Sequence, residues 1–157
     1  MKNIAFYPTF LGLIGIVKKN GAITELFFGK KHKSTDCVEQ ETPLLKEAAR
    51  QLEEYLDGKL KSFDLPLALE GTDFQQTVWA TLRTIPYGET RTYKQVAESI
   101  GNPEASRAVG AANNKNPILI ITPCHRVIGT DGKLVGYAAG LEVKEKLLEM
   151  EKTNANS

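Results

Sequence analysis

The sequence predicts an α+β protein with two parts, a small N-terminal sheet that carries one helix and a C-terminal helix-turn-helix region. Two apolar runs, residues 11–17 and 22–28, flank Lys18-Lys19-Asn20-Gly21, and Asn-Gly between such runs is a strong hairpin signal because both central turn positions need positive φ. After Gly71 the composition becomes helical, with two short helices joined by a tight turn at Gly101. We therefore predict one domain over residues 1–70 and a second over residues 71–157.

Composition and charge fit an ordinary globular chain of 157 residues, with 41% hydrophobic and 25% charged residues. No run of 18 apolar residues occurs, so we expect no transmembrane helix and no membrane partner. The N-terminus lacks the charged and apolar regions of a signal peptide, which favours an intracellular, cytoplasmic location. The net charge of +1 creates no global field that would attract a polyanion.

The N-terminal part contains a further strand near residues 4–7, before the hairpin. Residues 29–41 are polar and predict a loop. A helix then begins with Thr42 as cap and Pro43 at the first helical position, carries an apolar face through Leu56 and ends before Gly58. Residues 59–69 predict an edge strand or a linker.

The C-terminal part opens with a helix that Thr72 or Asp73 can cap and that ends at the turn residues 85–88. Thr92 caps a second short helix over residues 93–100, and a third helix covers about residues 104–113. Gly110 and the alanines after it make the third helix slim, so its backbone can approach a groove. Plain packing of an α-hairpin explains the helices equally well.

The remaining elements follow a polar turn at residues 113–117. The apolar run 118–121 predicts a buried strand that ends at Pro123, which cannot continue a central ladder. A turn at residues 129–133 and the stretch 134–140 predict a small β wing. An amphipathic helix over residues 141–151 closes the fold, and the polar tail 152–157 is expected to fray.

Cys124 follows the predicted buried strand and precedes His125 and Arg126. Basic neighbours at the end of a buried run favour a reactive thiolate, and an adjacent imidazole can activate a thiol. The alternative is an ordinary core cysteine, since free cysteines are among the most buried residues. Local chemistry leaves both interpretations open. The other histidine, His32, lies in the polar loop and is expected to be a solvated surface residue.

The remaining motifs exclude several classes of chemistry. Cys37 and Cys124 lie far apart and belong to no CxxC pair, so both are expected to be free thiols, Cys37 as a structural or incidental one. Two cysteines and two histidines at these spacings match no zinc template. Neither GxxxxGK[ST] nor GxGxxG is present. We therefore expect no metal and no cofactor.

The charge distribution is uneven in the helical region. Residues 83–133 contain about seven bases and about four acids. Such an excess permits contact with a phosphate backbone but is also compatible with a normally solvated surface. A helix-turn-helix candidate followed directly by a candidate reactive cysteine nevertheless suggests thiol chemistry performed on DNA.

Pro123-Cys124-His125-Arg126-Val127 resembles the active-site motif of the O6-alkylguanine-DNA alkyltransferases, or methylated-DNA–protein-cysteine methyltransferases. The resemblance covers about residues 71–151 and includes Phe74-Gln75-Gln76-Thr77-Val78-Trp79 and Ile85-Pro86-Tyr87-Gly88-Glu89-Thr90. It implies a ribonuclease H-like N-terminal supporting lobe and a C-terminal winged helix-turn-helix lobe that binds DNA and accepts the alkyl group.

The resemblance implies DNA repair by a single irreversible transfer. A monomer would bind double-stranded DNA through the minor groove, near the nucleoid, and rotate an O6-alkylguanine out of the stack. The Cys124 thiolate would then take the alkyl group from guanine O6, and also from thymine O4, and keep it as a thioether.

The resemblance also implies residue roles. His125 would draw the proton from Cys124 through a water, Glu151 would orient that histidine as in a triad, and Asn116 would act as the hinge before the active-site turn. Further residues would contact DNA or the flipped base. These are Tyr93, which can donate to guanine N3, Arg107, which fills the vacated space in the stack, and also Ala105, Ser106, Val127, Tyr137 and Ala138.

Some positions depart from relatives. Ala138 stands where some have serine, which removes a hydroxyl contact, and Ala139 stands where many have glycine, so an added methyl narrows the pocket for bulky adducts. The metal ligands that some relatives carry in the N-terminal lobe are missing. Two competing classes are a lesion-binding protein without transfer, against which Cys124 argues, and a winged-helix transcription regulator.

Overall fold

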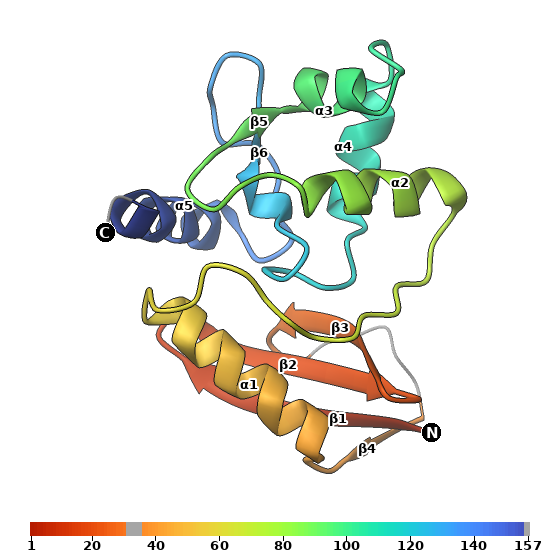
Figure 1. Cartoon of the computed structure of the whole chain (residues 1–157), viewed down its shortest axis with the longest axis vertical. Coiled ribbons are helices and arrows are strands. Elements are labelled where there is room, and N and C mark those ends of the chain that lie inside the picture. Colours follow the sequence, from red (N-terminus) through yellow and green to blue (C-terminus); the bar gives the residue numbers. More distant parts are fainter. Residues whose placement is uncertain (31–35, 156–157) are drawn as a thin grey trace. The chain divides into compact units, whose positions relative to one another are not determined.

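The computed structural model describes residues 1–30 and 36–155, which divide into two compact units, Met1–Glu70 and Gly71–Ser157 (Figure 1). The first unit combines a mixed sheet with one helix, and the second is largely helical. The predicted α+β class is thereby confirmed. Within the described ranges, no helix is long and apolar enough to cross a membrane.

The N-terminal unit is built on a four-stranded sheet in the order β3-β2-β1-β4. Strands β1 (Lys2–Thr9), β2 (Gly12–Lys19) and β3 (Ala22–Phe28) form an antiparallel meander. Asn20 and Gly21 have φ values of 50° and 79°, as a tight hairpin turn requires. The three predicted strands and their hairpin are confirmed.

The prediction of a loop over residues 29–41 was wrong at one place. Cys37–Glu39 form β4, a short edge strand parallel to β1. A strand of three residues is too short to show an alternating apolar and polar pattern in the sequence. Its strand conformation is set by pairing with β1, which is distant in sequence. His32 and its neighbours over residues 31–35 lie outside the described residues.

Helix α1 (Pro43–Leu56) runs along one face of this sheet (Figure 1). Its predicted cap is confirmed, because the Thr42 hydroxyl accepts a hydrogen bond from the Leu45 N–H at 3.3 Å. The apolar face that packs on the sheet is buried: Leu45, Ala48, Leu52, Tyr55 and Leu56. The following segment 59–69 forms no strand and meets the sheet through a single parallel bridge between Ile23 and Leu67.

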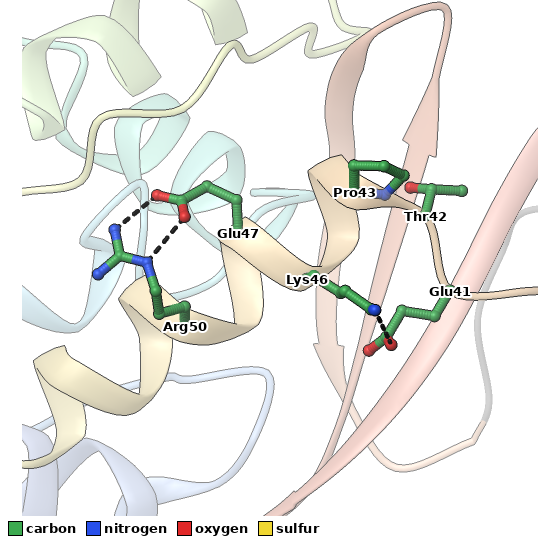
Figure 2. Close-up of a pocket in the computed structure, with 6 residues that line it drawn as sticks. All are labelled: Glu41, Thr42, Pro43, Lys46, Glu47 and Arg50. Atoms are coloured by element: carbon green, nitrogen blue, oxygen red, sulfur yellow. Dashed lines mark hydrogen bonds and ion pairs between the residues drawn. The ribbon is translucent and has the colours of Figure 1, made fainter.

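Charged residues line a surface pocket at the start of α1 (Figure 2). Arg50 and Glu47 are paired at 2.7 Å, and Lys46 lies 3.9 Å from Glu41. These side chains are well exposed, and exposed ion pairs contribute little to stability. The pocket contains no group predicted to carry chemistry, so we interpret it as the solvated end of the helix.

The C-terminal unit begins with α2 (Asp73–Leu82), α3 (Tyr93–Ser99) and α4 (Ser106–Asn114). The predicted caps are confirmed: Thr72 and Thr92 each accept from the backbone N–H three residues on, and each forms a complete capping box. Helices α3 and α4 pack against each other and against α2. Trp79 is 1% exposed and its indole N–H donates to the Ala112 carbonyl at 2.9 Å, which ties α2 to α4.

The run 118–121 is buried as predicted, but the prediction of a strand was wrong. The chain makes successive tight turns, in which the Thr122 N–H donates to the Ile118 carbonyl at 3.0 Å and the Cys124 N–H to the Thr122 carbonyl at 2.8 Å. Ile120 has a φ of 72°, a left-handed conformation that costs a β-branched residue about 1–2 kcal/mol. The apolar character of residues 118–121 predicted their burial correctly. It could not show that their backbone forms hydrogen bonds within the segment instead of with a neighbouring strand.

The β wing predicted from residues 129–140 does not form either, since residues 133–137 are irregular and a turn follows at residues 138–139. The strand that follows Cys124–Arg126 is β6 (Val127–Ile128), which pairs in parallel with β5 (Arg91–Thr92). Helix α5 (Leu141–Ala155) extends beyond Glu151. Residues 152–155, where a frayed tail was predicted, are therefore helical. Residues 156–157 lie outside the described residues.

The bond between Trp79 and Ala112 makes a testable contribution to the C-terminal unit. Trp79→Phe keeps an aromatic ring but removes the indole donor to the Ala112 carbonyl, which keeps only the Lys115 N–H at 3.1 Å, so we expect the free energy of unfolding to fall by about 0.5–1.5 kcal/mol. Urea unfolding followed by circular dichroism measures this change. An unchanged unfolding midpoint would show that the indole N–H contributes nothing.

Candidate active site

Cys124 lies in a short 3-10 turn, Cys124–Arg126, that follows directly on the buried turns. Asn116 holds this approach, since its side-chain amide donates to the Thr122 carbonyl at 2.8 Å and accepts from the Ile118 N–H at 3.0 Å. Pro123 has no N–H and starts the turn. The thiol is therefore placed by a rigid, internally bonded segment.

The thiol of Cys124 is only 2% exposed. Burial raises its pKa to about 11, against the opposing effects of a hydrogen bond from Asn116 and the positive charge of Lys144. At neutral pH the resting thiol is therefore protonated. A nucleophilic role requires a group that removes its proton when a substrate is bound.

His125, the next residue, makes a buried ion-pair network with Glu151 and Arg126. Its Nε2 lies 2.7 Å from Glu151 Oε2, while Arg126 donates from Nε to Glu151 Oε1 at 2.8 Å and from Nη2 to Oε2 at 3.0 Å. Arg126 Nη1 donates to the Ile85 carbonyl at 2.7 Å, and its guanidinium lies 5.7 Å from the centre of the Tyr87 ring. The Glu151 carboxylate thus joins helix α5 to the cysteine turn, and Arg126 links that turn to the segment after α2.

The pKa values fix the charges in this network. Burial alone would raise the pKa of Glu151, but hydrogen bonds with His125 and Arg126, together with the guanidinium charge, outweigh it and lower the pKa to about 2. Burial lowers the pKa of His125, an effect that Glu151 only partly opposes. The imidazole is thus neutral at pH 7 with its proton on Nε2, facing the carboxylate, so Nδ1 is the nitrogen that can accept a proton.

Lys144 is fully buried beside this network. Its ammonium donates to three backbone carbonyls: Val127 at 2.6 Å, Val135 at 2.9 Å and Gly136 at 3.3 Å. Burial lowers its pKa to about 8, and Cys124 opposes that shift. Lys144 therefore ties the segment after the cysteine turn to the irregular segment at residues 135–136, and brings a positive charge near the thiol.

Two tyrosines complete the surroundings of the thiol. The Tyr93 hydroxyl donates to the Val135 carbonyl at 3.1 Å, and the buried Tyr137 ring packs edge-on against His125 with ring centres 6.4 Å apart. Burial raises the pKa of both tyrosines, and the nearby charge of Cys124 adds to each shift. Both hydroxyls are therefore protonated donors at neutral pH.

The structure brings most of the predicted site residues together around Cys124: His125, Glu151, Asn116, Tyr93, Val127 and Tyr137. Ala138 is exposed just after Tyr137. Ala105, Ser106 and the exposed Arg107 lie apart from this group, at the N-terminal end of α4. They belong to a surface of the helix-turn-helix pair rather than to the cluster at the thiol.

Lys144 and Asn113 were not predicted to belong to the site, and Arg126 was named only as a basic neighbour of Cys124 within the motif, with no role in binding Glu151. The sequence offered a signal for Lys144, since it shares a helical face with Leu147 and Glu151 at spacings of three and four. That face of α5 is buried, although the apolar pattern of residues 141–151 indicated a face of leucine, valine and methionine. Long-range contacts identify Arg126 and Asn113, and the local sequence does not.

Comparisons with known proteins follow the two units. Residues 73–153 match the family model described as the 6-O-methylguanine DNA methyltransferase DNA binding domain, and residues 4–69 match the ribonuclease-like domain of the same methyltransferases. The chain belongs to the 6-O-methylguanine DNA methyltransferase family. The predicted resemblance is thereby confirmed, for both lobes.

Relatives in this methyltransferase family are similar over most of the chain. A methylated-DNA--protein-cysteine methyltransferase of Methanosarcina barkeri is 70% identical over 109 residues, 69% of each chain. One from Methanosarcina acetivorans is 61% identical over 122 residues, 78% of each chain. The structure of Mycobacterium tuberculosis OGT in complex with DNA is similar at a TM-score of 0.91 and 44% identity, over 97% of this chain and 94% of that one.

The buried carboxylate gives this methyltransferase a pH-dependent stability. Because the folded-state pKa of Glu151 lies below its ordinary value of 4.5, its stabilising contribution is present above pH 4.5 and is lost as the pH falls toward about 2. Glu151→Gln leaves Arg126 uncompensated, so we expect the free energy of unfolding at pH 7 to fall by about 3–5 kcal/mol.

Urea unfolding of both proteins between about pH 7 and pH 3 tests this linkage. The difference between wild type and Glu151→Gln should shrink on acidification. Glu149→Gln, an exposed change on the same helix, should stay within about 0.5 kcal/mol of wild type. A difference that is constant with pH would contradict the assigned charge state of Glu151.

Proposed function

We propose that this chain repairs DNA by moving a methyl or other alkyl group from O6 of guanine to its own Cys124. The observation that carries the proposal is a buried thiol, in the fold of this family, beside an imidazole whose proton is fixed by a carboxylate. A relative that is 70% identical over 109 residues carries the name methylated-DNA--protein-cysteine methyltransferase. The enzyme class follows from that family, and the residue roles below are our proposal.

The reaction begins with proton transfer. His125 accepts the Cys124 proton at Nδ1, through a water, while Glu151 receives the imidazolium N–H at Nε2. The nearby Lys144 ammonium stabilises the thiolate, and Asn116 donates to it. Burial keeps the thiol neutral at rest, which protects it from side reactions, and the nucleophile forms only when the substrate is bound.

The thiolate then displaces guanine at the alkyl carbon. The new S–C bond forms as the C–O6 bond breaks, and the electron pair of the broken bond stays with the guanine. Tyr93 donates a hydrogen bond to guanine N3, which stabilises the developing negative charge and makes guanine a better leaving group. The product is a thioether, which water does not cleave, so each molecule reacts once.

DNA binding supplies access to the buried base. A monomer binds double-stranded DNA from the minor groove with α4, and Ala105 and Ser106 lie close to the backbone at the start of that helix. Arg107 enters the stack and fills the space left by the flipped guanine. Tyr137 lines the base pocket, and backbone groups near Val127 and Ala138 contact the guanine edge. O4-alkylthymine is accepted by the same route.

Transfer itself is tested by mass. After incubation with DNA that contains O6-methylguanine, we expect one added methyl group per protein, mapped to Cys124, and no turnover beyond one equivalent. Cys124→Ala should bind the same DNA and gain no mass. Binding by the wild-type protein without any change in mass would refute transfer and indicate a lesion-binding protein instead.

The role of Arg107 is tested by comparing duplex with single-stranded DNA. Arg107→Ala should slow transfer from duplex DNA by about tenfold or more, because it no longer offsets an unstacking cost of a few kcal/mol, and should leave transfer from single-stranded DNA nearly unchanged. Lys115→Ala removes an exposed positive charge after the other end of α4 and controls for charge alone. Equal losses on both DNA forms would make Arg107 a simple phosphate contact.

A further inference from the structure

Asn113 is a buried side chain whose hydrogen bonding is incomplete. It lies at the C-terminal end of α4 and is 2% exposed. Its Nδ2 donates to the Cys124 carbonyl across a long 3.5 Å, and Oδ1 has no hydrogen-bond partner in the described part of the chain. A buried acceptor without a partner has lost its hydrogen bonds to water and gained none in return, so such an atom at an active site indicates a partner that arrives with the substrate.

The position of this amide points to the base pocket. Burial raises the pKa of Tyr93, the charge of Cys124 adds to that shift, and a hydrogen bond with Asn113 opposes it. Asn113 thus lies between the Tyr93 hydroxyl and the Cys124 carbonyl. The Tyr137 hydroxyl is a second buried group without a hydrogen-bond partner among the described residues, and it too is affected by the charge of Cys124. These polar groups gather where the flipped base must present its edge to the thiol.

The chemistry of the lesion selects what Oδ1 can bind. Alkylation at O6 removes the proton from N1, so N1, N3 and N7 of O6-alkylguanine are all acceptors. The exocyclic 2-amino group is the base's remaining N–H donor. An acceptor such as Oδ1 is therefore matched to the 2-amino group, and O4-alkylthymine offers it no N–H at all.

We infer that Asn113 is a specificity-determining residue whose Oδ1 accepts a hydrogen bond from the 2-amino group of the flipped O6-alkylguanine. The inference rests on the proposed function and adds a side-chain reader to the backbone contacts of the pocket. The inference also predicts that bases with a 2-amino group are preferred over bases without one, since a base without the amino group leaves the buried Oδ1 unpaired. Rejection of such analogues is the usual consequence of a polar site built for one hydrogen bond.

The test compares two bases that differ only in the 2-amino group. Single-turnover rates of methyl transfer are measured from duplex DNA with O6-methylguanine and with O6-methylhypoxanthine. Asn113→Leu removes the acceptor at similar volume. We expect it to lower the ratio of the two rates by about tenfold, because only the guanine reaction loses an acceptor for its 2-amino group, whereas loss of the Nδ2 bond to the Cys124 carbonyl affects both reactions alike.

Two further variants separate recognition from structure. Asn113→Asp keeps an acceptor and should retain the wild-type ratio, although its buried charge slows both reactions. Asn114→Leu, on the exposed neighbour in α4, should change both rates by the same factor. If Asn113→Leu also changes both rates equally, its role is structural and the inference fails. Absence of transfer by the wild-type protein would instead refute the proposed function.

Discussion

The C-terminal unit depends on one buried carboxylate. Glu151 accepts from His125 and from two nitrogens of Arg126, and all three side chains are almost completely buried. A lone buried charge would be very costly, so the buried carboxylate and the buried guanidinium each require the other as a partner. The His125 imidazole forms the further hydrogen bond to Oε2 of the carboxylate. This requirement joins α5 to the cysteine turn, since neither element could bury its charged group alone.

The glycine turn before β5 is shaped by the same requirement. Gly88 has a φ of 82°, and its N–H lies 3.4 Å from Glu151 Oε1. A Cβ at Gly88 would lie 2.5 Å from that of Ala155, so a side chain there would push α5 away from the turn. The backbone of residues 85–88 is thus fitted to α5, and the Ile85 carbonyl receives the last nitrogen of Arg126. Residues 85–90, which resemble a sequence motif of the methyltransferase family, therefore support the Glu151 carboxylate through their backbone.

Local sequence signals predicted the parts of the fold whose information is local. Asn20-Gly21 specified the hairpin and Thr42, Thr72 and Thr92 the helix starts, because turn and cap geometry depend on adjacent residues. The run 118–121 was predicted to be buried, but its turns depend on the Asn116 amide and on Ile120 at positive φ. Lys144 likewise donates hydrogen bonds to the Val135 and Gly136 carbonyls, in the stretch where a β wing was expected. No local sequence pattern predicts these contacts. The resemblance supplied the long-range pairing of His125 with Glu151, which spacing alone could not give.

The charges around Cys124 give a physical reason for a reaction that occurs once. At rest the buried groups near the thiol include two cations, Arg126 and Lys144, and one anion, Glu151, while His125 and Cys124 are neutral. Carbonyl oxygens hold the Lys144 ammonium, and burial lowers its pKa to about 8. Burial keeps the thiol neutral at rest by raising its pKa to about 11, while Lys144 and Asn116 partly oppose that shift and so stabilise the thiolate that forms when a base removes the proton. An S-alkylated Cys124 can no longer carry the thiolate charge, and the feature that activates the nucleophile is lost with the first transfer.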